Sequence, residues 1–244
     1  MSGTTPVPHL HPRVVALVPA SGRGTRMGGI RPKQFLSVGG VPLMVHALRT
    51  LQASEWIEQI IVAAPASEHD FCRQDVIAPY RLTKVTTVVE GGRERQDSVR
   101  AALQLVPDGM DVVLVHDAVR PFLTEDIIVR ACKAAVAEGG AVVAIPARDT
   151  LKEVGPGHAI QRTVDRTPLW QAQTPQVFRR ALLQQAHARA EADGYVGTDE
   201  ADLVQRIGAR VVVVEGSGEN MKVTRPEDLI IAEAIWAARN GNSL

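Results

Sequence analysis

The sequence predicts an α/β protein with an open, doubly wound and mostly parallel sheet, from which a β-arm protrudes. Short apolar runs alternate with helical patterns along most of the chain, which is typical of parallel strands joined by right-handed crossovers. Between residues 147 and 175 this alternation gives way to two short strand patterns around a Gly-Pro-Gly turn. A chain of 244 residues is long enough to form one sizeable core of this kind.

The strands are predicted from short, mainly apolar runs, and the run 14–18 is apolar throughout, as expected when both faces of a sheet are covered. These runs lie at 14–18, 59–64, 85–89, 112–116, 141–145 and 211–215. One helix opens at Pro42, and further helical patterns cover 67–77, 96–105, 124–138, 179–192, 198–207 and 226–239. We expect Thr124 and Thr198 to cap their helices, and Pro226 fits the first turn of the last helix.

Composition limits the classes of partner. The chain has 27 lysines and arginines and 27 aspartates and glutamates, so the sequence argues against nucleic acid as a bulk polyanionic partner. Its two cysteines have no paired metal-ligand spacing and suggest a reducing, cytoplasmic location, and no apolar run is long enough for a membrane span. Residues 1–12 are expected to be a disordered extension rather than a signal peptide, followed by one domain over 13–240.

The segment after the first strand has the composition of a phosphate-binding loop. Gly22 and Gly24 carry no Cβ, so the loop's N–H groups can face phosphate oxygens, and Arg26 and Lys33 add two cations. The spacing is not that of a Walker A loop, and Met27 stands where a dinucleotide-binding fingerprint needs its third glycine, which excludes a dinucleotide-dependent dehydrogenase. An ordinary strand-to-loop connection with incidental glycines stays open as the alternative.

Three further loops follow predicted strands, at 90–98, 116–121 and 146–152, where ligands of open α/β sheets bind. Asp117 can bind Mg²⁺ together with nucleotide phosphates, or it can be a helix cap or a surface partner of Arg120. The loop 91–99 contains two glycines and Ser98, and on pattern alone it can be a glycine turn followed by the first turn of a helix. Lys222 precedes the last predicted helix, where a lone lysine is more often solvated.

Several motifs resemble those of sugar-nucleotide and alditol nucleotidyltransferases, which share a Rossmann-like sheet. V-P-A-S-G-R-G-T-R-M and P-K-Q are similar to the phosphate loop of the cytidylyltransferase branch, and H-D-A-V-R-P resembles its H-D-A-A-R-P motif. G-G-R-E-R-Q-D-S-V, Q-T-P-Q and N-M-K-V-T-R-P-E-D-L extend the resemblance, so that it covers about residues 14–233. The chain departs at Ser21 and Val119, where alanine is more usual. Together the motifs identify a member of the 2-C-methyl-D-erythritol 4-phosphate cytidylyltransferase family.

The resemblance implies residue roles that the pattern alone leaves open. The implied catalytic residues are Arg26, Lys33, Arg166 and Lys222. The implied nucleotide contacts are Ala20, Ser21, Gly22, Gly24, Gly92, Arg93, Ser98 and Ala118. The implied contacts to the second substrate are Asp117, Arg120, Thr150, Arg166 and Thr174, and Asp117 is also the expected metal ligand. His116 is expected to be structural, because a phosphate nucleophile is already deprotonated near neutral pH and needs no base.

The same resemblance implies transfer of CMP from CTP to an alditol phosphate with release of pyrophosphate, and Mg²⁺ or another divalent cation as cofactor. It also implies a homodimer, in which Thr150 and Arg166 on the arm (147–175) reach the site of the second subunit. On pattern alone that segment can equally be a surface loop. Two other functions stay open: a ribitol-5-phosphate cytidylyltransferase, and a catalytically silent nucleotide-binding regulator.

Overall fold

The computed structural model describes residues 12–22 and 32–241 of the chain. The main strands are β1 (Val14–Pro19), β4 (Ile57–Ala64), β5 (Val85–Glu90), β6 (Val112–Val115), β7 (Gly140–Pro146), β10 (Trp170–Arg179) and β11 (Val212–Glu215). Within the described residues they form a seven-stranded sheet in the order β11-β7-β10-β6-β1-β4-β5. Two small pairs accompany it, β2 (Ser37–Val38) with β3 (Val41–Pro42), and β8 (Leu151–Val154) with β9 (Ile160–Val164).

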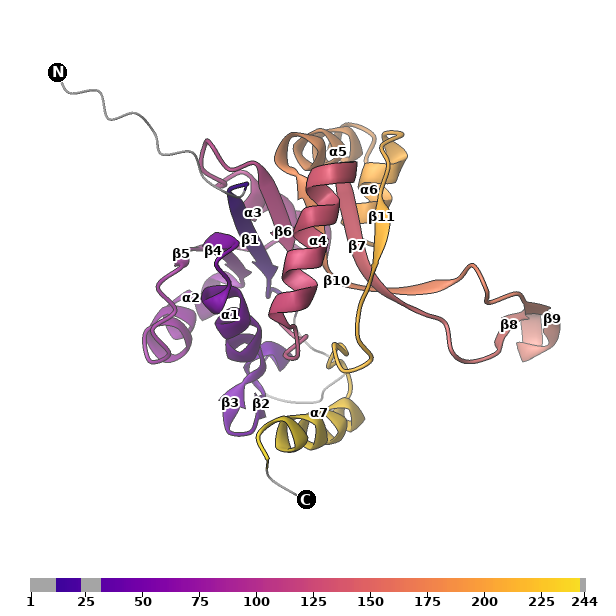
Figure 1. Ribbon diagram of the computed structural model, residues 1–244, viewed down its shortest axis with the longest axis horizontal. Helices are drawn as coiled ribbons and strands as arrows, with labels where there is room; N and C mark the ends of the chain where they lie inside the picture. The colour runs from indigo at the N-terminus through magenta and orange to yellow at the C-terminus, as the bar shows by residue number, and fades with distance from the viewer. Residues whose placement is uncertain (1–11, 23–31, 242–244) are drawn as a thin grey trace.

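Helices cover both faces of the sheet (Figure 1). The helices are α1 (Leu43–Ala53), α2 (His69–Phe71), α3 (Arg95–Leu103), α4 (Glu125–Glu138), α5 (Arg180–Ala192), α6 (Glu200–Arg206) and, below the ends of the strands in Figure 1, α7 (Pro226–Arg239). Residues of α1 and α4 pack with one face of the strands, and residues of α3, α5 and α6 pack with the other. The doubly wound sheet predicted from the alternation of strands and helices is therefore confirmed.

The largest difference from the prediction is β10, which the sequence pattern did not reveal. It lies between β6 and β7 and runs antiparallel to both, whereas β1 is parallel to β4 and β6. Its buried part contains polar side chains, namely Gln173, Thr174 and Gln176. An apolar run therefore could not mark this strand, although it occupies the middle of the sheet.

Two helix starts also differ from expectation. Thr124 occupies the position before α4, but its side chain makes no capping hydrogen bond. The helix α6 is capped by Asp199, whose carboxylate accepts a hydrogen bond from the Asp202 N–H at 2.9 Å, and not by the Thr198 hydroxyl. The helix expected over 67–77 is divided into three short turns, 66–68, 69–71 and 72–77.

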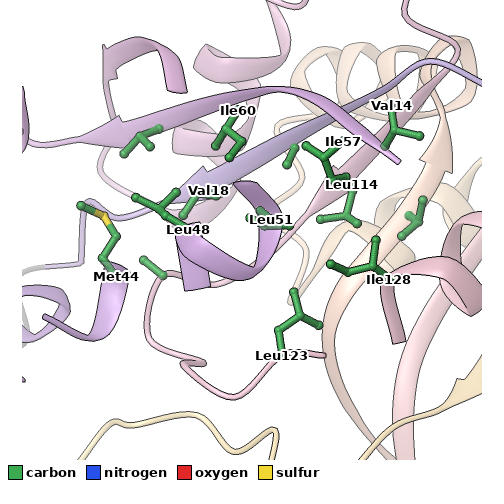
Figure 2. Packing of buried hydrophobic residues seen from close by; sticks show 14 of the residues in the cluster. Val14, Val18, Met44, Leu48, Leu51, Ile57, Ile60, Leu114, Leu123 and Ile128 are labelled. Carbon is green, nitrogen blue, oxygen red and sulfur yellow. The ribbon is translucent and has the colours of Figure 1, made fainter. Parts of the chain in front are cut away.

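The core explains why the apolar runs were reliable signals. Every residue from Val14 to Val18 is fully buried, and successive side chains enter the cores on opposite faces of the sheet. Figure 2 shows one of these cores, in which Val14 and Val18 meet side chains of neighbouring strands and helices such as Leu48 and Ile128. Burying such a side chain contributes about 1.5–3 kcal/mol relative to its exposed state.

A smaller third core lies beneath the ends of the strands. It joins residues 36–43, 119–122 and 221–223 to α7, with Val119, Phe122 and Val223 at its centre. Gly39 closes one side of it, because its N–H donates to both carboxylate oxygens of Glu233 at 3.0 Å. The helix α7 is thereby fixed against the β2–β3 hairpin.

Gly39 is expected to be intolerant of any side chain. Its φ is +58°, and an added Cβ would lie 2.2 Å from the Trp236 ring. Gly40 has a similar φ of +73° but no described atom within 4 Å of such a Cβ. We expect Gly39→Ala to lower the free energy of unfolding in urea by about 3 kcal/mol, from both strain and overpacking, and Gly40→Ala by only about 1 kcal/mol. If the two variants lose the same free energy of unfolding, the contact with Trp236 does not contribute to the loss at Gly39.

The arm leaves the sheet between β7 and β10 and projects away from it (Figure 1). At its tip β8 and β9 pair antiparallel, with Leu151 opposite Val164. Most arm side chains are exposed, and this includes apolar ones: Val154 is 50% exposed and Ile160 63%. An isolated two-stranded hairpin of this kind is marginally stable in water unless it packs against another surface.

No helix within the described ranges is long and apolar enough to cross a membrane. The two cysteines, Cys72 and Cys132, are unpaired and buried. The expected disordered extension, residues 1–12, lies outside the described residues except for Pro12.

Candidate active site

An open cleft of about 1660 Å³ lies at the carboxyl ends of β1, β4, β5 and β6, where ligands of open α/β sheets bind. Its wall brings together most of the residues predicted from the sequence. These are Ala20, Ser21, Gly22, Lys33, Gly92, Arg93, Ser98, Asp117, Ala118 and Lys222. Two other predicted residues, Gly24 and Arg26, lie outside the described residues.

The first loop of the cleft is fixed to the end of β4. The Ala20 N–H and the Ser21 hydroxyl both donate to the Ala63 carbonyl, at 2.7 Å and 3.0 Å. The Ser21 hydroxyl also lies against Gly91, where an added Cβ would be 1.6 Å from Oγ. Glycine is therefore required at 91, because the loops after β1 and β5 touch at this point.

The second loop is fixed internally. The Gly92 N–H donates to Ser98 Oγ at 3.1 Å, and Ser98 Oγ donates to the Glu94 carbonyl at 3.2 Å. Ser98 is 1% exposed, so its hydroxyl supports the loop from beneath in this structure. The Arg93 side chain, by contrast, is 93% exposed at the edge of the cleft. A direct contact between Ser98 and a nucleotide remains a prediction.

Asp117 is the electrostatic centre of the site. Its Oδ1 accepts a hydrogen bond from Arg95 Nε at 2.9 Å, while its Oδ2 lies 2.9 Å from Lys222 Nζ and 3.7 Å from Arg120 Nε. Burial alone would favour the neutral acid, but Arg95, Lys222 and Arg120 together hold the pKa of Asp117 well below its usual range. The carboxylate is therefore ionised at neutral pH.

His116 supports the backbone of this loop and does not face the cleft. Thr174 Oγ accepts from the Asp117 N–H at 3.0 Å, and its O–H donates to His116 Nδ1 at 3.0 Å, because Nε2 faces a carbonyl and must carry the single proton of the neutral ring. Nε2 of His116 then donates to the Arg120 carbonyl at 3.1 Å. Burial lowers the pKa of His116 to about 4, which keeps the ring neutral. The histidine is structural, as expected.

Arg120 and Thr174 lie behind Asp117 instead of on the cleft wall. Arg120 Nη1 donates to the Asn220 carbonyl at 2.7 Å, and the fully buried Asn220 side chain donates to the Thr174 carbonyl at 2.8 Å. These bonds fix the turn that carries Lys222. Direct contacts of Arg120 and Thr174 with substrate remain predictions.

Asp117 is a carboxylate of the cleft that could hold a divalent cation. Within the described residues no cluster of three or more His, Cys, Asp or Glu side chains could hold a metal alone. Asp117 nevertheless fits an ion that arrives with a triphosphate, since Mg²⁺ usually takes one or two carboxylates and completes its shell with phosphates and water. The neighbouring cations already balance this carboxylate, so it suits a phosphate-bound ion better than a resident one.

Thr150 and Arg166 are not in the cleft of their own chain. Both are exposed on the arm, and Arg166 Nη1 donates to the Arg148 carbonyl. The structure thus divides the predicted residues into a group around the cleft and a group on the arm.

Sequence reasoning missed Arg95 and Glu200 as members of the site. Arg95 lines the cleft and binds Asp117, and its Nη1 donates to Glu200 Oε2 at 2.5 Å. Glu200 lies in the first turn of α6, and its side chain is only 1% exposed. The sequence gives little indication of this ion pair, because Arg95 and Glu200 are 105 residues apart.

Glycine loops, two lysines and a buried ionised carboxylate meet at the carboxyl edge of a mostly parallel sheet, which is the arrangement expected of an α/β enzyme that binds nucleotide phosphates. Comparison with known proteins gives the particular family. The sequence model described as 2-C-methyl-D-erythritol 4-phosphate cytidylyltransferase matches residues 14–238. The chain belongs to this family.

Individual relatives are similar to this chain over nearly their whole length. A protein of that name from Syntrophus aciditrophicus is 47% identical, covering 95% of this chain and 99% of the relative. The crystal structure of the protein of that name from Thermus thermophilus is 36% identical, with a TM-score of 0.78 and coverage of 91% and 98%. The crystal structure of 4-diphosphocytidyl-2C-methyl-D-erythritol synthase from Anaerococcus prevotii is 26% identical, with a TM-score of 0.80 and coverage of 92% and 98%.

Proposed function

We propose that this enzyme transfers CMP from CTP to 2-C-methyl-D-erythritol 4-phosphate, giving 4-diphosphocytidyl-2-C-methyl-D-erythritol and pyrophosphate in isoprenoid precursor biosynthesis. The observation that carries the proposal is the convergence of Lys33, Asp117 and Lys222 with two glycine loops in one cleft. Membership of the family supplies the choice of substrates. A cytoplasmic location is part of the proposal.

In this reaction a phosphate oxygen of the alditol attacks the α-phosphorus of CTP in line with the departing pyrophosphate. The protein contributes mainly positioning and neutralisation of charge. Lys33, with Arg26 from the segment outside the described residues, stabilises charge on the α-phosphate and pyrophosphate. Lys222 directs the attacking phosphate and is itself oriented by Asp117 at 2.9 Å.

A divalent cation is the proposed cofactor, and Mg²⁺ is the ion we favour. Asp117 would hold it together with the triphosphate, and the ion would supply additional neutralisation of the phosphate charges. The protein itself already supplies positive charge around that carboxylate. Three cations, Arg95, Arg120 and Lys222, form ion pairs with only two carboxylates, Asp117 and Glu200.

The direct test is pyrophosphate release by the purified protein with CTP and Mg²⁺, compared between methylerythritol phosphate and ribitol 5-phosphate. Release with methylerythritol phosphate alone is the expected result. Release with ribitol 5-phosphate alone would keep the chemistry and overturn the substrate. Binding of CTP without release in either case would favour a silent regulator.

We further propose that the enzyme is a homodimer whose arms complete the sites in trans. This is supported by the exposure of Val154 and Ile160 on an arm without a core of its own, and by the position of Thr150 and Arg166 outside the cleft of their own chain. Arg166 suits the role, because a guanidinium can bind a phosphate through two parallel hydrogen bonds.

Mixing two inactive variants tests this arrangement. If Arg166 acts in trans, a mixed dimer of Lys33→Ala and Arg166→Ala subunits contains one intact site and one doubly defective site. Equal mixing should therefore restore about a quarter of the wild-type rate of pyrophosphate release, since half of the dimers are mixed. Each variant alone is the control. Different affinity tags on the two variants show that mixed dimers have formed. If mixed dimers form and the rate of pyrophosphate release does not recover, Arg166 acts in the site of its own chain.

A further inference from the structure

Arg95 joins two acidic side chains that come from distant parts of the chain. From the first turn of α3 its Nε donates to Asp117 Oδ1 at 2.9 Å, and its Nη1 donates to Glu200 Oε2 at 2.5 Å. Asp117 and Glu200 side chains are 8% and 1% exposed, while Arg95 is 27% exposed on the cleft side. Burial opposes the charge of Arg95, but Glu200 and Asp117 raise its pKa, so the guanidinium stays charged.

The position of Glu200 is fixed by the antiparallel strand β10. Gln176 on that strand accepts hydrogen bonds from the N–H groups of Glu200 and Ala201, at 3.1 Å and 3.2 Å. Its amide nitrogen donates to the Asp199 carboxylate at 2.8 Å. The start of α6 is thus anchored to the centre of the sheet, and Glu200 presents its carboxylate to Arg95 from a rigid support.

We propose that Arg95 and Glu200 are positioning residues for Asp117, an inference that rests on the proposed function. The two oxygens of a free carboxylate are equivalent and can exchange by rotation about the side-chain bond. Arg95 binds Oδ1 and leaves Oδ2 for Lys222, so the lysine is held at 2.9 Å on the cleft side. Glu200 in turn prevents the guanidinium from turning away from Asp117 into the cleft.

The alternative is that the Arg95–Glu200 pair only joins α3 to α6. The same helix α3 provides a comparison, because Arg100 forms an ion pair with Glu191 on α5 and makes no described contact with Asp117. A pair that merely joins helices should behave like Arg100–Glu191 when it is broken. A pair that positions Asp117 should affect turnover selectively.

The experiment compares Glu200→Gln and Arg95→Lys with Glu191→Gln in the assay of pyrophosphate release. Both site variants should lower kcat by about tenfold or more, because Asp117 and Lys222 act at the reacting phosphates, with the KM for CTP changed less than about threefold. Glu191→Gln should leave both constants within about twofold. Circular dichroism at the assay temperature establishes that each variant is folded.

A second readout does not depend on turnover. The Arg95 Nε–H, assigned by its loss in Arg95→Lys, should give an NMR signal that exchanges slowly with water in the wild type and faster in Glu200→Gln. A folded Glu200→Gln enzyme with unchanged kcat and an unchanged Nε–H signal would overturn the positioning role. If the wild type releases no pyrophosphate, the proposed function fails, and the Nε–H signal alone decides whether Glu200 holds Arg95 on Asp117.

Discussion

Replacing Lys33 by alanine is expected to lower the rate of pyrophosphate release by about a hundredfold or more, which corresponds to several kcal/mol of the barrier. Lys33 follows Pro32 and begins a short turn over Lys33–Phe35, in which Gln34 and Phe35 are buried. The backbone therefore holds the lysine at a fixed place on the cleft wall. An added Cβ at Gly22 would lie 3.7 Å from Lys33 Cε, so the side chain lies beside the loop after β1.

The reason for the large effect is that positive charge at this place is needed most when the α-phosphate and the leaving pyrophosphate gain charge. The loss should therefore appear mainly in kcat, with the KM for CTP rising less. Lys133→Ala, on the exposed side of α4, is the matched control and should retain the wild-type rate. A Lys33→Ala enzyme with near wild-type kcat would remove Lys33 from the mechanism.

The elements that the sequence predicted well are those in which burial and residue type agree locally. Val14–Val18 is apolar throughout because both faces of β1 are covered, and this pattern is visible in the sequence alone. The strand β10 could not be recognised in the same way. Its Gln176 binds the start of α6 and its Thr174 supports Asp117, so polar residues occupy positions where an apolar residue would have marked a central strand.

The candidate site shows a similar division. Lys33, Asp117 and Lys222 stand out because each follows a recognisable strand or motif, and the structure brings all three to one cleft. Arg95 and Glu200 do not stand out, since an ion pair between residues far apart in sequence leaves no local pattern. Arg26 and Gly24 lie outside the described residues, and their roles stay predictions from the resemblance.

Asp117→Asn is expected to affect both stability and activity, because the carboxylate holds together three cations. The asparagine keeps the shape of the side chain but leaves Arg120 without its compensating charge in a largely buried place, and it leaves Arg95 with Glu200 alone. Removing one partner of a buried ion pair typically costs about 3–5 kcal/mol, and we expect a loss of this size in the free energy of unfolding by urea at pH 7. Asp126→Asn, which breaks an exposed pair with Arg130, should cost about 0.5 kcal/mol.

The pH dependence of this loss identifies its origin. The folded-state pKa of Asp117 lies far below its unfolded value of about 3.9, so the stability contributed by the carboxylate is complete above that value. It decreases as the pH falls further, because the unfolded chain then takes up a proton that the folded protein does not. The difference between wild type and Asp117→Asn should accordingly be constant from pH 8 to about pH 5 and shrink in stronger acid. A difference that instead stayed constant in stronger acid would mean that packing, and not charge, makes Asp117 necessary, because a packing effect does not depend on proton binding; the loss of pyrophosphate release in the variant would then reflect a distorted loop.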